Sequence, residues 1–144
     1  MGFLQGGQWV DKWHDTKSTG GRYQRKPSTY RSWITPDGSA GPSGGSGFKA
    51  EAGRYHLYVS WACPWAHRAL IFRAIKGLEE MISISTVNPV MVSEGWTFEP
   101  GDNVIPDSGY GAQRRYEVYL KADPNYEGRV TVPTLWDRET GTIV

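Results

Sequence analysis

The chain has 144 residues, of which 38% are hydrophobic and 22% are charged, with a formal net charge of +1 at pH 7. This length suffices for one domain with its own core, and the composition excludes a disordered chain. The near-neutral charge gives no indication of a nucleic-acid partner, and no run of about 18 apolar residues indicates a membrane span. The single cysteine, Cys63, excludes an internal disulfide. The first 15 residues lack the pattern of a secretory signal, so we expect a cytoplasmic protein.

The N-terminal third differs in composition from the rest of the chain. Residues 1 to about 50 are rich in Gly, Ser, Pro and isolated aromatic residues and show no helical or strand period. Residues 35–47 are typical of turns and loops. Several aromatic and apolar side chains can anchor this segment to another surface: Trp9, Trp13, Tyr30, Trp33 and Ile34. We therefore predict an extended arm over residues 1–50 and a folded domain over residues 51–144.

The first regular elements are predicted directly after this arm. Alternating side chains over residues 55–61 predict a strand. Apolar residues at helical spacing over residues 65–76 predict a helix, with Pro64 suited to its first position and Gly77 to its exit. Alternation over residues 82–87 predicts a second strand, which is parallel to the first because a helix connects the two.

The second half of the domain is predicted to continue with a long loop over residues 88–108 and a helix over residues 112–122. Residues 131–136 lead into a strand, residues 138–141 form a hairpin turn, and residues 142–144 begin a last strand. A parallel βαβ unit followed by a helix and an antiparallel hairpin is the arrangement of an α/β thioredoxin-like domain. Such a domain ends on a further helix, so we expect it to be incomplete at its C-terminus and its sheet to be covered by a following segment.

Cys63 lies between the first predicted strand and the predicted helix. Unpaired N–H groups and a partial positive charge at a helix start stabilise a thiolate, which is the nucleophilic form of the side chain. His67 and Arg68 add positive charge one turn further along. The alternative is that Cys63 is a small apolar core residue. Ala66 stands where a Cys-x-x-Cys pair has its second cysteine, so an external thiol must resolve any disulfide.

The Val132-Pro133 bond precedes a predicted strand, where thioredoxin-like domains use a cis peptide bond. In that conformation the N–H and C=O of Val132 turn outward and can pair with an extended peptide ligand. The alternative is an ordinary entry into a strand.

His56 lies among aromatic residues of the first strand, where we expect a hydrogen-bonded structural role. The three histidines lack the paired spacing of metal ligands, so no metal site is predicted.

Five segments of the chain carry a resemblance to a known family. They are residues 60–68 (SWACPWAHR), 87–89 (VNP), 95–98 (GWTF), 129–133 (RVTVP) and 14–21 (HDTKSTGG). Together they resemble the glutathionyl-hydroquinone reductases, which are also called Xi-class glutathione transferases. The core of residues 63–68 is specific to this family, whereas the proline motif is shared by all glutathione transferases.

The resemblance implies glutathione-dependent reduction of glutathionyl-hydroquinones. In this family the cysteine that matches Cys63 attacks the sulfur of the substrate, and a second glutathione resolves the resulting mixed disulfide. The resemblance also implies that Trp96, Arg129 and the backbone of Val132, next to Pro133, bind glutathione as a co-substrate. A planar ring packs over the peptide, an arginine pairs with a carboxylate, and Val132 pairs backbone to backbone. The alternatives are a packing role for Trp96 and a solvated Arg129.

The family continues beyond the part that this chain matches. A Glu-Ser pair holds the glutamyl end of glutathione, and an all-helical domain supplies tyrosines to the hydroquinone site and much of a dimer contact. The resemblance therefore implies a homodimer for the full-length form, with glutathione and glutathionyl-hydroquinones as its partners rather than nucleic acid or a membrane. A hypothesis of a different class remains open, in which the chain is a truncated glutathione-binding or partner-binding remnant without turnover.

Overall fold

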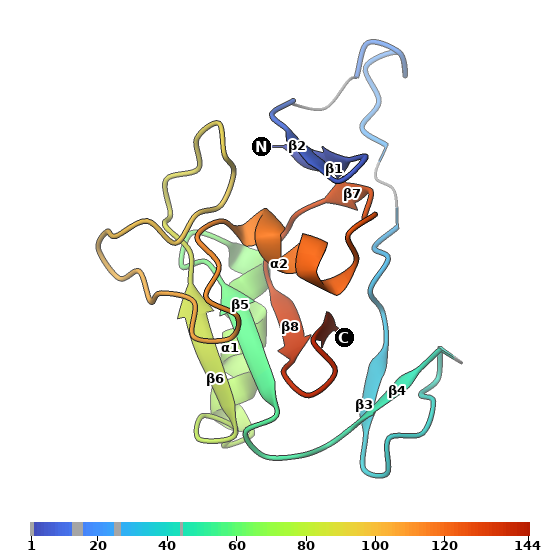
Figure 1. Cartoon of the computed structure of the whole chain (residues 1–144), viewed down its shortest axis with the longest axis vertical. Coiled ribbons are helices and arrows are strands. Elements are labelled where there is room, and N and C mark those ends of the chain that lie inside the picture. The colour runs from blue at the N-terminus through green and yellow to red at the C-terminus, as the bar shows by residue number, and fades with distance from the viewer. Residues whose placement is uncertain (1, 13–15, 25–26, 44) are drawn as a thin grey trace.

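A mixed four-stranded sheet forms the centre of the protein in a computed structural model of the chain (Figure 1). The structure describes residues 2–12, 16–24, 27–43 and 45–144. The strands lie in the order β6 (Ile82–Thr86), β5 (Tyr55–Val59), β8 (Thr134–Asp137) and β9 (Thr142–Ile143). β5 and β6 are parallel, and β8 is antiparallel to both β5 and β9. This order and these directions confirm the predicted thioredoxin-like arrangement.

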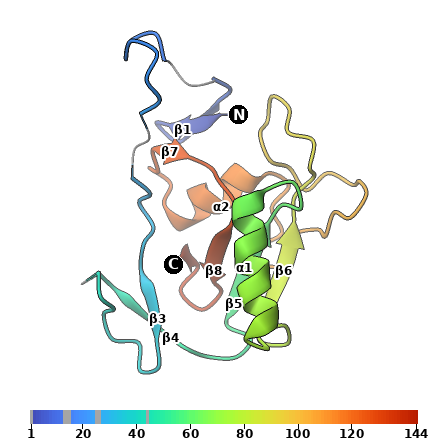
Figure 2. The same cartoon turned by 180° about the vertical axis from the view of Figure 1, so that it is seen from behind.

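Two helices cover opposite faces of this sheet. α1 (Pro64–Ile75) lies over one face, and α2 (Arg115–Ala122) packs on the other (Figures 1 and 2). Ala66 of α1 clusters with Leu57 and Val59 of β5, whereas Val118 of α2 belongs to the cluster that contains Tyr58. Because successive side chains of β5 point to opposite faces, all five of its residues are buried. Within the described residues, neither helix is long and apolar enough to cross a membrane.

The elements around Cys63 begin and end close to their predicted positions. α1 starts at Pro64 and ends at Ile75, and Gly77 at φ 63° provides the left-handed exit that a helix end favours. β5 stops at Val59, two residues earlier than predicted, because the chain turns there and the N–H of Cys63 donates to the carbonyl of Ser60 at 3.1 Å. This turn leads the chain from the end of β5 into the start of α1.

α2 begins three residues later than predicted. The preceding residues are extended and bond to the long loop, since the N–H of Phe98 donates to the carbonyl of Gln113 at 2.9 Å. The carboxylate of Glu117 accepts from the N–H groups of Gln113 and Arg114, at 2.8 and 3.3 Å. These bonds satisfy backbone donors at the start of the helix, so a periodic pattern that reaches back to residue 112 overestimates its length.

The N-terminal arm contains short strands that the sequence pattern does not reveal. β1 (Phe3–Gln5) and β2 (Gln8–Val10) form a hairpin, and β1 also pairs with β7 (Gly128–Arg129). β3 (Trp33–Thr35) and β4 (Gly47–Lys49) form a separate parallel pair. Each of these strands has two or three residues, which is too few for an alternating pattern to be recognised.

The arm packs on the domain of its own chain. Leu4 in β1 is 1% exposed and belongs to the same hydrophobic cluster as Val118 and Trp136. Trp9 and Tyr30 are half-buried against that cluster, as expected of anchoring side chains. Trp13, another expected anchor, lies outside the described residues. Trp33 is not an anchor to this cluster, because its side chain is 48% exposed. The arm therefore contributes to the core on the α2 side of the sheet.

Candidate active site

Cys63 is the residue that precedes the first turn of α1. Its φ of −102° and ψ of 113° are extended, and Pro64 follows at the first helical position. The N–H of His67 donates to the carbonyl of Cys63 at 3.1 Å, which closes the first turn. The side chain is half-buried rather than enclosed in the core, and its Sγ lies 3.6 Å from the carbonyl oxygen of Val132. The thiol therefore lies at the start of the helix and next to the proline loop.

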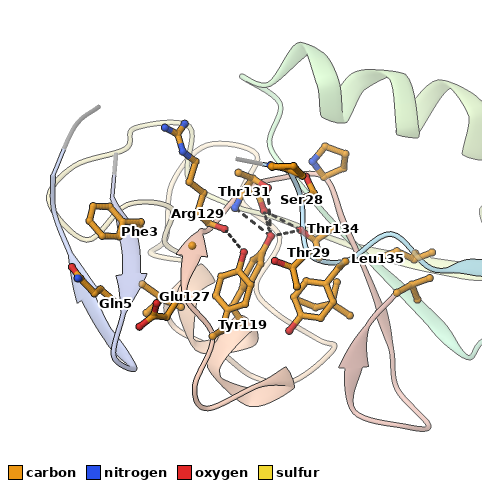
Figure 3. A pocket seen from close by; sticks show the side chains of 18 of the residues that line it. Phe3, Gln5, Ser28, Thr29, Tyr119, Glu127, Arg129, Thr131, Thr134 and Leu135 are labelled. Atoms are coloured by element: carbon orange, nitrogen blue, oxygen red, sulfur yellow. Dashed lines mark hydrogen bonds between the residues drawn. The ribbon is translucent and has the colours of Figure 1, made fainter. Parts of the chain in front are cut away.

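The Val132-Pro133 bond is cis, as predicted. A hydroxyl network fixes the segment around it to α2. The hydroxyl of Tyr119 lies 3.4 Å from Oγ1 of Thr131 and 3.3 Å from Oγ1 of Thr134, and Thr134 donates to the carbonyl of Thr131 at 2.9 Å (Figure 3). These contacts hold the residues on both sides of the proline, and so they fix the loop that faces Cys63.

Trp96 lies in the long loop, directly after a tight turn of residues 92–95. It is half-buried against the hydrophobic cluster that Cys63 also contacts. Its carbonyl accepts a hydrogen bond from the N–H of Arg115 at 2.8 Å. Trp96 therefore has packing contacts of its own, and the start of α2 holds its backbone.

Arg129 lies in β7, opposite Phe3 of β1. One nitrogen of its guanidinium donates to the hydroxyl of Tyr23 at 3.0 Å, and the guanidinium carbon lies 5.5 Å from the centre of the Tyr23 ring. Tyr23 belongs to the N-terminal arm. The alternative for Arg129 was a solvated side chain, whereas in the structure its guanidinium contacts this tyrosine.

Arg129 and Pro133 line a cavity of about 520 Å³ between the arm and the α2 side of the sheet (Figure 3). Three tyrosines, Tyr30, Tyr119 and Tyr126, form part of its wall. Cys63 and Trp96 are not among the described residues that line it. The structure thus brings Cys63, Val132 and Pro133 together and places Arg129 on an adjoining hollow.

Two residues at this site were missed by sequence reasoning. Tyr23 contacts Arg129 although 106 positions separate them, and no local pattern links two such residues. Tyr119 was assigned only to a helix, although its hydroxyl holds the proline loop. The one available signal was the i, i+3 pair of Thr131 and Thr134 around the Val-Pro motif, because hydroxyls at that spacing can bond each other's backbone.

His67 and Arg68, the basic residues that follow Cys63 in the sequence, both lie in α1. Arg68 stacks on the ring of Trp65, with its guanidinium carbon 5.2 Å from the ring centre, and both side chains are exposed. His67 is also exposed.

Among the residues whose structure is described, no group of three or more His, Cys, Asp and Glu side chains is placed to hold a metal ion.

His56 is fully buried and has the structural role that was expected. Its Nδ1 lies 2.7 Å from Oγ of Ser83, and its Nε2 lies 2.9 Å from Oγ of Ser85. Burial, followed by the positive charge of Arg138, lowers the pKa of His56 from its ordinary value of 6.5 to about 4. His56 is therefore neutral at physiological pH and connects β5 to β6.

Arg115 is a buried cation at the start of α2. Its guanidinium carbon lies 4.3 Å from the ring centre of Tyr58 and 5.0 Å from that of Tyr119. Within the described part of the chain, none of its side-chain nitrogens has a hydrogen-bond partner, and burial lowers its pKa. The rings of Tyr58 and Tyr119 take the place of the usual hydrogen bonds. Arg115, whose N–H donates to the carbonyl of Trp96, is thus in contact with Tyr119, whose hydroxyl holds the proline loop.

Comparisons with known proteins match this arrangement. The sequence model of the glutathione S-transferase N-terminal domain matches residues 62–144. A glutathionyl-hydroquinone reductase from Escherichia coli, YqjG, is 57% identical over 147 aligned positions, which cover 100% of this chain and 44% of the relative. The chain therefore spans less than half the length of this curated relative.

Solved structures of similar proteins agree. A Xi-class transferase from Natrialba magadii superposes with a TM-score of 0.82 at 41% identity, over 100% of this chain and 41% of that one. The glutathione-bound structure of Escherichia coli YqjG superposes with a TM-score of 0.77 at 56% identity, over 80% of this chain and 38% of that one. The chain therefore belongs to the glutathione S-transferase family, in the group of Xi-class transferases and glutathionyl-hydroquinone reductases.

Proposed function

We propose that Cys63 is the nucleophile of a glutathione-dependent reduction whose substrate is a glutathionyl-hydroquinone. The observation that carries this proposal is the position of the thiol, which is half-buried at the start of α1 with its Sγ 3.6 Å from the carbonyl oxygen of Val132. A peptide that pairs with the backbone of Val132 lies within reach of this sulfur. The thiolate is the attacking form of a cysteine side chain.

The proposed reaction has two steps. In the first, the Cys63 thiolate attacks the glutathione sulfur of the substrate, an S–S bond forms and the bond between sulfur and the aromatic carbon breaks. The electron pair of the broken bond goes to that carbon, which takes a proton, and the hydroquinone leaves. In the second step, the thiolate of a free glutathione attacks the glutathione sulfur of the mixed disulfide and releases glutathione disulfide and the Cys63 thiolate.

The proposed glutathione site uses Trp96, Arg129, Val132 and Pro133. In it the Trp96 ring packs against the tripeptide, Arg129 pairs with a carboxylate, and the Val132 backbone forms hydrogen bonds. Two findings support this assignment: Cys63 and Trp96 pack against the same hydrophobic cluster, and a relative that is 56% identical has been solved with glutathione bound. A homodimer of the full-length form and a cytoplasmic location belong to the same proposal.

A single-turnover experiment tests the proposal. The full-length form, which includes the helical domain that the resemblance implies, is mixed with one equivalent of a glutathionyl-hydroquinone without free glutathione, and hydroquinone is followed by chromatography. We expect about one equivalent of hydroquinone per Cys63, and then release of glutathione disulfide when glutathione is added. Cys63→Ser is the matched control and releases no hydroquinone. Equal release by Cys63→Ser contradicts the proposal, and a mixed disulfide formed from glutathione disulfide without hydroquinone release supports the alternative of glutathione binding without turnover.

A further inference from the structure

The N-terminal arm contacts both segments that carry proposed glutathione-binding side chains. β1 pairs with β7, so that Phe3 lies opposite Arg129. From β2, the neighbouring strand of the hairpin, Trp9 reaches the turn of residues 92–95 that directly precedes Trp96. The two strands of one hairpin thus contact two segments that lie more than 30 positions apart in the sequence.

The contact of Trp9 with this turn is both polar and steric. The indole N–H donates to the carbonyl of Ser93 at 2.8 Å. At Gly95, which has φ 72°, an added Cβ would lie 2.7 Å from atoms of the Trp9 ring. The indole therefore packs directly against the glycine backbone. The N–H of Gly95 donates to the carbonyl of Val92 at 2.9 Å, so the turn that Trp9 contacts is itself closed.

Trp9 is held in place from its other side by α2. Its ring stacks on that of Tyr116, with 5.2 Å between the ring centres and 17° between the ring planes. The residue after Gly95 is also bound to α2, because the N–H of Arg115 donates to the carbonyl of Trp96. The backbone on both sides of Gly95 is thus fixed to one helix, through the Trp9 side chain before it and through a direct hydrogen bond after it.

We infer that Trp9 is a positioning residue that sets the orientation of Trp96, and that the N-terminal arm is therefore a working part of the glutathione site. This inference rests on the proposed role of Trp96 in glutathione binding. In this inference Trp9 acts through the turn of residues 92–95 and not by binding glutathione itself. Its hydrogen bond and its ring packing restrict the turn, so the orientation of Trp96 is set before the ligand arrives.

The test compares two rates of Cys63 modification in the 144-residue chain. Reaction with glutathione disulfide depends on glutathione recognition and on thiol reactivity, whereas reaction with iodoacetamide depends on thiol reactivity alone. The ratio of the two rate constants therefore reports recognition. We expect Trp9→Phe, which loses the N–H donor and keeps a ring beside Tyr116, to lower this ratio about three- to ten-fold.

Three further variants make the test specific. Trp33→Phe is the matched control, because Trp33 lies in β3 at the far end of the arm and is 48% exposed (Figure 1). Its ratio stays at the wild-type value. Gly95→Ala pushes a methyl group into the Trp9 ring and lowers the ratio as Trp9→Phe does. In a Trp96→Ala background, Trp9→Phe has no further effect, because the side chain through which Trp9 acts has been removed.

The outcomes separate this inference from the proposed function. If the wild-type ratio equals that of the chain unfolded in urea, the proposed glutathione site is contradicted and the inference falls with it. If Trp96→Ala lowers the ratio but Trp9→Phe does not, the site stands and the inference is overturned. Equal losses from Trp9→Phe with and without Trp96 also overturn it, because they indicate a general effect on folding.

Discussion

The position of the Cys63 sulfur is set by backbone contacts on both sides of the residue. The turn that ends β5 fixes its N–H, and the first turn of α1 fixes its carbonyl. The thiol then contacts the carbonyl of Val132, whose loop is held by the hydroxyl of Tyr119 through Thr131. None of these contacts requires a second cysteine, which agrees with a mechanism in which an external thiol completes the reaction.

At the same scale, His56 predicts how stability depends on pH. Its pKa is about 4 in the folded chain and 6.5 when exposed, so the unfolded chain binds one more proton between these values. Stability is therefore highest above pH 6.5 and falls as the pH is lowered toward 4, by about 3 kcal/mol in total. Urea unfolding at several pH values measures this, and His56→Gln flattens the dependence in that range. The same slope in both proteins contradicts the prediction.

Arg115 predicts an unusual pair of mutational effects. Its buried guanidinium loses hydration and has two tyrosine rings in place of hydrogen bonds, so the rings offset only part of the cost of burying the charge. We expect Arg115→Met, which keeps the volume, to change the free energy of unfolding by less than about 1 kcal/mol. Arg115→Ala leaves a cavity and lowers it by about 3 kcal/mol. Urea denaturation compares the two variants, and an equal loss in both shows that the charge itself is essential.

At the scale of elements, the hairpin of β1 and β2 links the N-terminus to the site. Leu4 is buried in the core beside Val118, and β1 completes the pairing of β7, which carries Arg129. The arm is thus joined to the domain by backbone pairing and by apolar packing. A segment whose composition indicates only loops holds part of the proposed glutathione site.

This packing predicts a large effect of a single truncation in the arm. Leu4→Ala removes most of a side chain that is 1% exposed, and we expect the free energy of unfolding to fall by about 2–5 kcal/mol. Gln8→Ala, at an exposed position of the same hairpin, is the control and changes stability by less than about 0.5 kcal/mol. Both values come from urea unfolding followed by circular dichroism. A small effect of Leu4→Ala would show that the arm detaches in solution.

The elements that the sequence predicted correctly are those that carry their own periodic signal. The strands β5 and β6 alternate over five residues each, and α1 has a proline at its start and a glycine after its end. The short strands β1 and β7 exist because they pair across more than 120 positions, which no local pattern shows. Likewise, Cys63 and the proline loop were found from motifs, whereas the contacts of Tyr23 and Trp9 depend on the path of the arm through space.

At the scale of the whole molecule, α1 exposes an apolar stripe. Trp65, Phe72 and Ile75 lie on one side of the helix and are 63%, 57% and 73% exposed. On the same face of the sheet, Ile84 and Leu135 are only half-buried. An exposed apolar surface of this kind is unusual for a protein in water.

The stripe predicts that the 144-residue chain binds a hydrophobic dye. We expect strong fluorescence of anilinonaphthalene sulfonate with the wild-type chain, and a marked decrease after Phe72→Lys and Ile75→Lys together, because these side chains form the exposed apolar surface. Val90→Lys, which replaces an exposed residue of the long loop outside α1, is the control and leaves the signal unchanged. Equal fluorescence in all three proteins locates the dye elsewhere.

The central claim is that Cys63 is a reactive thiol in a glutathione site, and intact-mass spectrometry after exposure to glutathione disulfide tests it most directly. Because Cys63 is the only cysteine, any adduct on the chain reports this residue. We predict one glutathione per folded chain, formed faster than on the chain unfolded in urea and removed by dithiothreitol, and no adduct on Cys63→Ser. An unmodified folded chain, together with a modified unfolded one, would show that Cys63 is an inert packing residue and would contradict the account.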